Sequence, residues 1–117
     1  MLPSLFVYGS LKRGFKHHDQ LQGLACAGRV RTATGYRLVV YHGYPALTRG
    51  GTNHVLGELY QVSPQCLRAL DAFEECPELY QRNVIDLVDG NPALAYTVEP
   101  EVADRYPALG DTEWRER

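Results

Sequence analysis

The chain has 117 residues, the size of one typical domain, and its 44% hydrophobic and 22% charged residues are typical of a globular protein with a buried core. A formal net charge of −2 excludes the overall positive field that recruits nucleic acid or an acidic membrane surface. No stretch approaches the ~20 consecutive apolar residues that cross a bilayer, and the N-terminus lacks the features of a secretory signal, so we expect a cytoplasmic protein with no membrane or nucleic-acid partner.

Cysteine and histidine spacing predicts neither a disulfide framework nor a metal site. The three cysteines, Cys26, Cys66 and Cys76, include no CxxC pair, which suits thiols kept reduced in the cytosol. None of the four histidines stands at a metal-ligand spacing from another histidine or from a cysteine. We therefore expect no bound metal.

The first predicted element is a strand that ends in a turn. Residues 5–8, Leu-Phe-Val-Tyr, form an unbroken apolar run that is typical of a fully buried strand. Gly9 lets the backbone turn sharply, so that the N–H groups after it converge as an anion-binding nest; a strand that simply turns a corner is the alternative. The loop continues with Lys12, Arg13 and Lys16, a small basic patch that we expect to be solvated.

The middle of the chain predicts short strands separated by turn signals, after one helical turn at residues 17–21. The predicted strands are residues 29–34, 36–41 and 55–62. Residues 42–51 contain His-Gly, Tyr-Pro and Gly-Gly, and predict a loop or a broken strand. Gly57, inside the last of these strands, indicates a bulge or the close approach of a second backbone.

One helix is predicted after these strands. Ser63 suits the N-cap and Pro64 the first helical position, where its missing N–H is not needed. The apolar positions of this helix are Cys66, Leu67, Leu70 and Phe73. We expect the helix to end before Pro77, because the residue preceding a proline disfavours helical geometry.

The last predicted elements form a hairpin. Residues 80–88 and 93–98 have strand composition and are joined by the turn sequence Asp-Gly-Asn-Pro. From about residue 99 on, the chain is a polar tail without periodicity. Short strands with one clear helix and no regular strand–helix alternation predict one α+β domain over residues 1–117, with a mixed sheet that is curled or closed into a small barrel.

Glu74 stands out because it falls on the apolar side of the predicted helix. At about 100° per residue, the apolar side chains cover an arc of about 120° around Leu70, and Glu74 lies inside this arc at about +40°. Asp71 lies at its edge, at about +100°, and Glu75 outside it, at about +140°. An ionised carboxylate buried there costs several kcal/mol unless it is paired, protonated or used. In a pocket its pKa would be raised toward neutrality, which suits a general base that later returns the proton.

Two other arrangements would give Glu74 a structural role or none. The helix could end before residue 74, which would leave the carboxylate solvated, or Glu74 could form an ion pair with an arginine such as Arg82. The sequence contains no GxSxG motif and no cysteine at a known spacing from a histidine, so it supplies no usual nucleophile for covalent catalysis.

Two segments of the chain, FVYGSLKRG and LDAFEECPELYQR, resemble the signatures of the gamma-glutamylcyclotransferase-like family, of the gamma-glutamylamine cyclotransferase type. FVYGSLKRG, residues 6–14, is similar to the N-terminal signature: an apolar strand, then Tyr-Gly-Ser/Thr-Leu and a basic residue. LDAFEECPELYQR, residues 70–82, is similar to the second signature, Leu-Asp-x-Phe-Glu followed by Pro, Tyr and Arg. They stand in the family's order, with short strands and a Tyr44-Pro45 turn between them, and the resemblance covers residues 5–98.

The resemblance implies a compact mixed β-barrel with flanking short helices. It also implies an enzyme that needs no cofactor or metal and converts a γ-glutamyl amide or γ-glutamyl amino acid to 5-oxoproline and the released amine. The substrate's own α-amine is the nucleophile, and Glu74 is implied to be the catalytic acid/base. The residues implied to bind the glutamyl part of the substrate are Tyr8, Gly9, Ser10 and Leu11.

Two functions of other classes stay open. The same fold could be a non-catalytic protein that binds a small carboxylate metabolite, or, with its 8 tyrosines, an interaction protein that works through exposed aromatic side chains. Glu75 stands where family members often have a small residue, which places a second negative charge beside the predicted site. The roles of Tyr80 and Arg82, the leaving amine and the oligomeric state are left open by the sequence.

Overall fold

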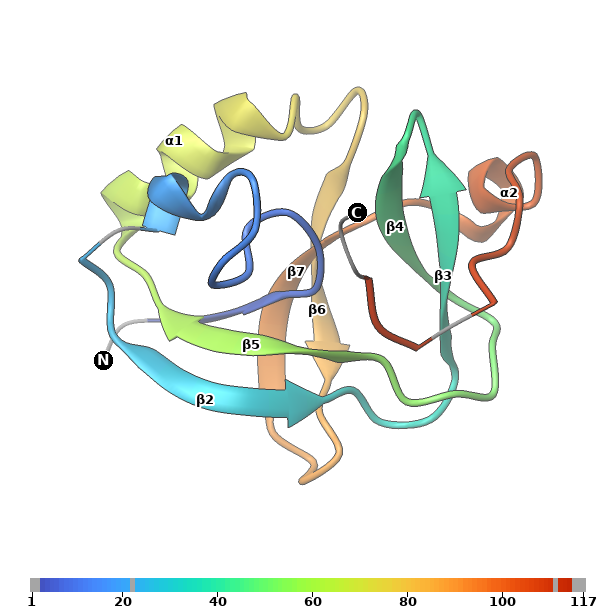
Figure 1. The fold of residues 1–117 in the computed structure, drawn as a ribbon, viewed down its shortest axis with the longest axis horizontal. Helices are drawn as coiled ribbons and strands as arrows, with labels where there is room; N and C mark the ends of the chain where they lie inside the picture. Colours follow the sequence, from blue (N-terminus) through green and yellow to red (C-terminus); the bar gives the residue numbers. More distant parts are fainter. Residues whose placement is uncertain (1–2, 22, 111, 115–117) are drawn as a thin grey trace.

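The fold is one curled mixed sheet with a helix beside it (Figure 1). It is described here from a computed structural model that covers residues 3–21, 23–110 and 112–114. The strands are β1 (Ser4–Val7), β2 (Cys26–Arg31), β3 (Tyr36–Tyr41), β4 (Tyr44–Arg49), β5 (Leu56–Gln61), β6 (Gln81–Asp86) and β7 (Pro92–Thr97). The helices are the 3₁₀ helix η1 (His18–Leu21), α1 (Pro64–Phe73) and α2 (Pro100–Ala103).

Strand β7 is the centre of the sheet, whose order is β2-β5-β1-β7-β4-β3 with β6 also paired to β7. One edge of β7 pairs along its length with β6, and the other pairs in parallel first with β1 and then with β4. In Figure 1 the β6–β7 hairpin accordingly runs between the β2–β5–β1 half and the β4–β3 half. A bridge between Thr32 and Leu87 joins the end of β2 to the chain after β6, so the sheet curls back on itself. The predicted α+β fold, a mixed sheet curled into a barrel-like shape with few short helices, is confirmed.

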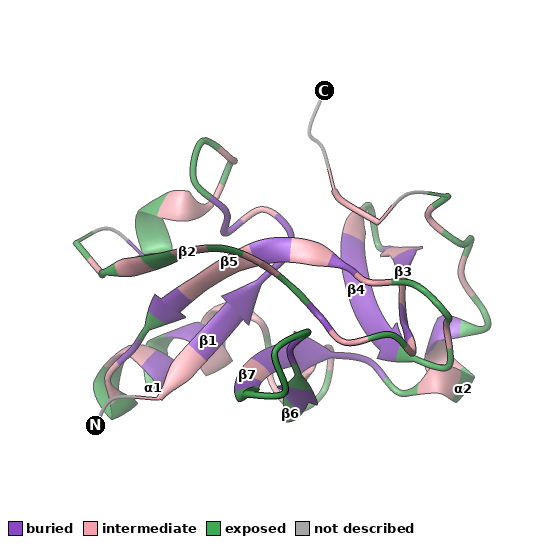
Figure 2. Cartoon of the chain, turned by 90° about the horizontal axis from the view of Figure 1, so that it is seen from below, coloured by how far each residue is buried: buried purple, intermediate pink, exposed green. Residues whose placement is uncertain are grey.

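Strand β1 is buried on both faces, as its unbroken apolar run predicts (Figure 2). Successive side chains of a strand point to opposite faces. Leu5 and Val7 therefore pack into one hydrophobic cluster, with the apolar side of α1, whereas Phe6 and Tyr8 pack into a second cluster with residues of β3 and β4. This double burial holds the end of β1, and the loop that follows, in a fixed place.

The main difference from the predicted elements is β4, a complete strand where the sequence indicates a loop or a broken strand. Pro45 is tolerated in it because its partner Val40 directs its N–H away from β4, to the carbonyl of Pro107 at 2.9 Å. The other predicted strands and the β6–β7 hairpin are present, with ends that differ from the predicted ones by at most three residues. Gly57 marks a close approach, because a Cβ there would clash with the backbone oxygen of Val7.

Helix α1 begins as predicted. The Ser63 hydroxyl accepts a hydrogen bond from the N–H of Cys66 at 3.1 Å, and Pro64 occupies the first turn. The helix ends at Phe73, with Glu74 as its C-cap. Its last turn therefore delivers Glu74 to the end of the helix that Figure 1 shows above the β1 loop.

The segment after residue 99 is more structured than its polar composition predicts. It forms α2 and then contacts β3, where the N–H of Leu109 donates to the carbonyl of Leu38 at 2.9 Å. Among the described residues, no helix is long and apolar enough to cross a membrane.

Candidate active site

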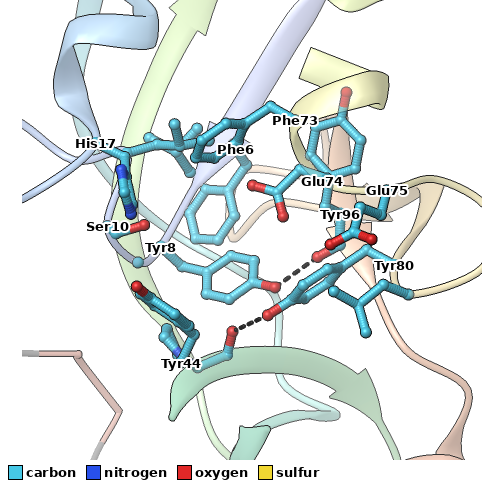
Figure 3. A pocket seen from close by; sticks show the side chains of 15 residues that line it. Phe6, Tyr8, Ser10, His17, Tyr44, Phe73, Glu74, Glu75, Tyr80 and Tyr96 are labelled. Carbon is cyan, nitrogen blue, oxygen red and sulfur yellow. Dashed lines mark hydrogen bonds between the residues drawn. The ribbon is translucent and has the colours of Figure 1, made fainter. Parts of the chain in front are cut away.

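A pocket of about 180 Å³ lies where the end of β1, the start of β4 and the end of α1 meet (Figure 3). Its lining residues are Phe6, Val7, Tyr8, Gly9, Ser10, Leu11, His17, Tyr44, Pro45, Phe73, Glu74, Glu75, Leu79, Tyr80 and Tyr96. All five residues predicted to form the site are therefore brought into one cavity, although Glu74 lies more than 60 positions from the loop of residues 8–11.

Glu74 is half-buried, and its carboxylate points into the pocket in Figure 3. Its backbone N–H donates to the carbonyl of Leu70 at 2.8 Å, which completes the last turn of α1 and fixes the direction of the side chain. Burial raises the pKa of Glu74 to about 7, because the charged form loses hydration without an opposing positive charge. The carboxylate is thus poised to take up and release a proton at neutral pH.

Glu74 is neither left in bulk solvent nor paired with Arg82, as the two structural alternatives would have it. The helix does end just before it, yet the side chain enters the pocket instead of bulk water. Arg82 binds Asp71 instead, with 2.6 Å between guanidinium nitrogen and carboxylate oxygen. Within the described part of the chain, the Glu74 carboxylate forms no ion pair.

The loop of residues 9–11 lines the same pocket, and its backbone N–H groups have no partner among the described residues. Its carbonyl oxygens are occupied: Gly9 accepts from the N–H of Lys12 at 3.0 Å and Ser10 from the N–H of His17 at 2.8 Å. The carbonyl of Leu11 bonds Nδ1 of His18 at 2.9 Å. Among the described residues, no acceptor receives the N–H groups of Gly9, Ser10 or Leu11. These donors are available to an anionic or carbonyl oxygen of a ligand.

Gly9 is required by a close approach. A Cβ at this position would lie 2.7 Å from Cγ of Pro45, a side chain whose ring has little freedom to move. Gly9 of the first loop and Pro45 of β4 therefore pack directly against each other, and both line the pocket.

Tyr8 lines the pocket, and its hydroxyl group is hydrogen-bonded to backbone groups of two neighbouring strands. The hydroxyl donates to the carbonyl of Tyr96 at 2.6 Å and accepts from the N–H of Leu47 at 3.0 Å, which joins β1 to β7 and β4. Burial raises the pKa of Tyr8, and the nearby Tyr80 and, to a smaller extent, Glu74 add to this. Tyr80 is held in a similar way, since its hydroxyl donates to the carbonyl of Pro45 at 3.0 Å (Figure 3).

Glu75 also lines the pocket, but its side chain is exposed. Its φ of 52° lies in the left-handed region, which is uncommon for a residue other than glycine. The turn that imposes this angle is closed on both sides: the N–H of Glu75 donates to the carbonyl of Ala72 at 3.2 Å, and its own carbonyl accepts from Leu79 at 2.9 Å.

Aromatic rings line one side of the pocket, and the sequence predicts only some of them. His17, Tyr44 and Phe73 lie along one side of the pocket, with ring centroids 5.1 Å apart for His17 and Phe73 and 6.0 Å for His17 and Tyr44. Tyr44 belongs to the Tyr-Pro turn noted in the sequence, and Phe73 directly precedes Glu74. Nothing in the sequence singles out His17, because its place in the pocket depends on the path of the first loop.

The prediction for Lys12 is wrong. Arg13 and Lys16 are exposed as expected, but Lys12 is only 3% exposed. Its ammonium is held by the C-terminal segment, a contact that no local pattern indicates. In the described residues, no group of three histidine, cysteine or acidic side chains is arranged to hold a metal ion.

Residues 5–116 match the protein family described as Gamma-glutamyl cyclotransferase, AIG2-like. A gamma-glutamylaminecyclotransferase of Rattus norvegicus is 45% identical over 92 residues, which are 71% of this chain and 62% of the rat protein. The chain thus matches less than two thirds of that relative's length. The crystal structure of an AIG2-like protein from Mus musculus superposes with a TM-score of 0.81 at 32% identity, over 97% of this chain and 88% of the mouse chain. A uropathogenic E. coli protein gives a TM-score of 0.79 at 27% identity, over 93% and 88% of the two chains.

Proposed function

This chain belongs to the Gamma-glutamyl cyclotransferase, AIG2-like family, and we propose that it converts a γ-glutamyl amide to 5-oxoproline and a free amine. The observation that carries this proposal is that one pocket is lined by an uncompensated carboxylate, Glu74, and by residues 9–11, whose N–H groups have no acceptor among the described residues. The name of the rat relative supports an amide whose leaving group is an amine.

The reaction is an internal transfer that consumes no second substrate. The α-amine nitrogen of the glutamyl group attacks its own γ-carbonyl carbon and closes a five-membered ring. The bond from that carbon to the leaving nitrogen then breaks, and the proton lost by the α-amine is returned to the leaving nitrogen. Because nucleophile and carbonyl belong to one molecule, holding the reactive rotamer alone contributes ~7–11 kcal/mol.

Glu74 is the proposed proton carrier. With a pKa of about 7, a large fraction of its carboxylate is ionised at neutral pH, and its protonated form is still acidic enough to donate to a departing amine. General acid–base catalysis of this kind is worth ~10²–10⁴-fold in rate.

The N–H groups of Gly9, Ser10 and Leu11 are the proposed binding site for the glutamyl part. They suit either its α-carboxylate or the oxygen that gains negative charge when the γ-carbonyl is attacked. The ring of Tyr8 would pack beside the same group, while its hydroxyl stays bonded to Tyr96 and Leu47.

The test is turnover of a panel of γ-glutamyl amines and γ-glutamyl amino acids by the purified protein, with 5-oxoproline as the measured product. Glu74→Gln should lower kcat by ~10²–10⁴-fold and leave the fold intact. Glu75→Gln is the matched control, because it removes the same charge from the adjacent, exposed position. If Glu74→Gln turned over as fast as the wild type, the acid/base assignment would be wrong.

The rival function, capture of a small carboxylate without chemistry, predicts a different result. It gives saturable binding of 5-oxoproline or glutamate and no product from any amide in the panel. We further propose a cytoplasmic protein made of one domain, in keeping with its three free cysteines and the single family match over residues 5–116. Fractionation of cells and limited proteolysis of the purified chain test these two points.

A further inference from the structure

Lys12 is a buried charge that the proposed reaction does not use. Lysine is almost never fully buried unless a partner compensates its ammonium, yet this side chain is 3% exposed. Its backbone is part of the first loop, because its N–H donates to the carbonyl of Gly9 at 3.0 Å and closes the turn. Its side chain is absent from the residues that line the pocket.

The C-terminal segment of residues 112–114 supplies the compensation. Nζ of Lys12 donates to the carbonyl of Trp114 at 2.9 Å and lies 3.6 Å from a carboxylate oxygen of Glu113. It also lies 4.5 Å from the centre of the Phe15 ring, a cation–π contact. Burial lowers the pKa of Lys12, and the Glu113 carboxylate opposes this.

The segment is itself tied to the sheet. The carbonyl of Thr112 accepts from the N–H of Leu56 at 2.8 Å, at the start of β5. Glu113 also forms an ion pair with Arg29 of β2, with 3.0 Å between the charged atoms. Lys12 is therefore connected through Glu113 and Thr112 to two strands of the rigid sheet.

The first loop is anchored at other points by groups outside it. The N–H of Arg13 donates to a carboxylate oxygen of Glu58 at 2.7 Å, and the carbonyl of Leu11 bonds His18. Lys12 combines two contacts: its N–H closes the turn of residues 9–12, and its side chain ties that turn to the C-terminal segment.

We propose that Lys12 is a positioning residue, whose ammonium, held by Glu113 and the carbonyl of Trp114, keeps the turn of residues 9–11 in its ligand-binding shape. This inference rests on the proposed role of that turn. Substrate binding at the N-terminal loop then depends on a segment about 100 positions away in the sequence.

The test compares Lys12→Met with Arg13→Met. The first removes the buried ammonium and keeps a stem of similar length, and the second removes an equal charge from the exposed neighbour. Since a misplacement of about 1 Å costs up to ~10²-fold, Lys12→Met should lower kcat/KM by roughly 10- to 100-fold, mainly through KM. Arg13→Met should change kcat/KM by no more than about twofold. Glu113→Gln should shift KM in the same direction as Lys12→Met, and Lys12→Arg should restore part of the loss.

Amide hydrogen exchange separates positioning from simple stabilisation. In Lys12→Met, the amides of residues 9–11 should exchange faster than in the wild type, and 5-oxoproline should protect them less, while amides of β7 keep their protection. Lower thermal stability with unchanged KM and unchanged loop exchange would overturn the proposal and leave Lys12 a structural residue. If the wild type proves inactive, the proposed function fails, but exchange with 5-oxoproline or glutamate as the probe still decides the role of Lys12.

Discussion

Above pH 7, Glu74→Gln should be more stable than the wild type. The same substitution should remove most of the proposed activity. The wild-type carboxyl has a pKa of about 7 in the folded protein instead of its ordinary 4.5, because burial penalises the charged form. The folded state therefore binds the proton more tightly than the unfolded state does. Glutamine fills the same volume without a charge, so it escapes the penalty.

The sign and size of the effect follow from that difference in pKa. The contribution of Glu74 to wild-type stability is greatest below about pH 4.5, falls as pH rises toward 7, and levels off once the carboxyl is ionised in both the folded and the unfolded state. The full difference corresponds to about 3 kcal/mol at pH 8, since one pKa unit is worth ~1.4 kcal/mol. For a domain of this size, 3 kcal/mol is a shift in Tm on the order of 10 °C.

The assay is urea or thermal unfolding of both proteins at several pH values between 4 and 9. The difference in stability between Glu74→Gln and the wild type should grow from near zero at low pH to its full size above pH 7. Glu75→Gln, at the exposed neighbouring position, controls for the loss of one negative charge. A stability difference that does not vary with pH would show that Glu74 is solvated in the folded protein, and the reasoning about the site would fail with it.

Two further substitutions test the walls of the pocket. Gly9→Ala should lower the free energy of unfolding by about 1–3 kcal/mol and raise KM, because the added Cβ would lie 2.7 Å from Cγ of Pro45. Unfolding and steady-state kinetic measurements on the same variant check this. An unchanged KM would argue against the close fit between Gly9 and Pro45. Tyr8→Phe should lower the free energy of unfolding by about 1–3 kcal/mol, because the N–H of Leu47 is left without its acceptor. Its kcat should stay within a few fold of the wild-type value. Denaturant unfolding and steady-state kinetics test this pair of effects, and a collapse of kcat in a folded Tyr8→Phe protein would give the hydroxyl a direct role in the chemistry.

The sequence predicts the local parts of the site well. The helical period alone distinguishes Glu74 from Glu75, and in the structure Glu74 is half-buried with its carboxylate in the pocket, whereas Glu75 lines the same pocket with an exposed side chain. The helix ends at Phe73, so the left-handed backbone of Glu75, which the period does not predict, also separates the two. Ser63 and Pro64 mark the start of α1 for reasons that act within one turn of the chain. Strand β1 is predictable for a similar reason, because an unbroken run of apolar residues by itself indicates a strand that is buried on both faces.

What the sequence does not predict depends on contacts between distant segments. Pro45 reads as a turn residue, and its place in β4 becomes possible only because Val40 bonds Pro107 instead of β4. Lys12 reads as a solvated cation, and its burial depends on Glu113, about 100 positions later. The sequence predicts Gly9 as a turn residue, whereas in the structure the absence of a side chain at this position is required by the nearby ring of Pro45.

The arrangement around Asp71 explains why Glu74 stays uncompensated. Arg82 is the basic residue of the second signature, and it pairs with Asp71, which also accepts a hydrogen bond from the hydroxyl of Tyr96 at 2.7 Å. A guanidinium next to Glu74 would lower the pKa of that carboxyl by ~1–3 units and weaken it as a base. Asp71, one turn earlier on α1, instead binds Arg82 of β6 and Tyr96 of β7, and so ties the helix end to both strands. Because Arg82 is bound to Asp71, the Glu74 carboxylate keeps the raised pKa that its proposed role as proton carrier requires.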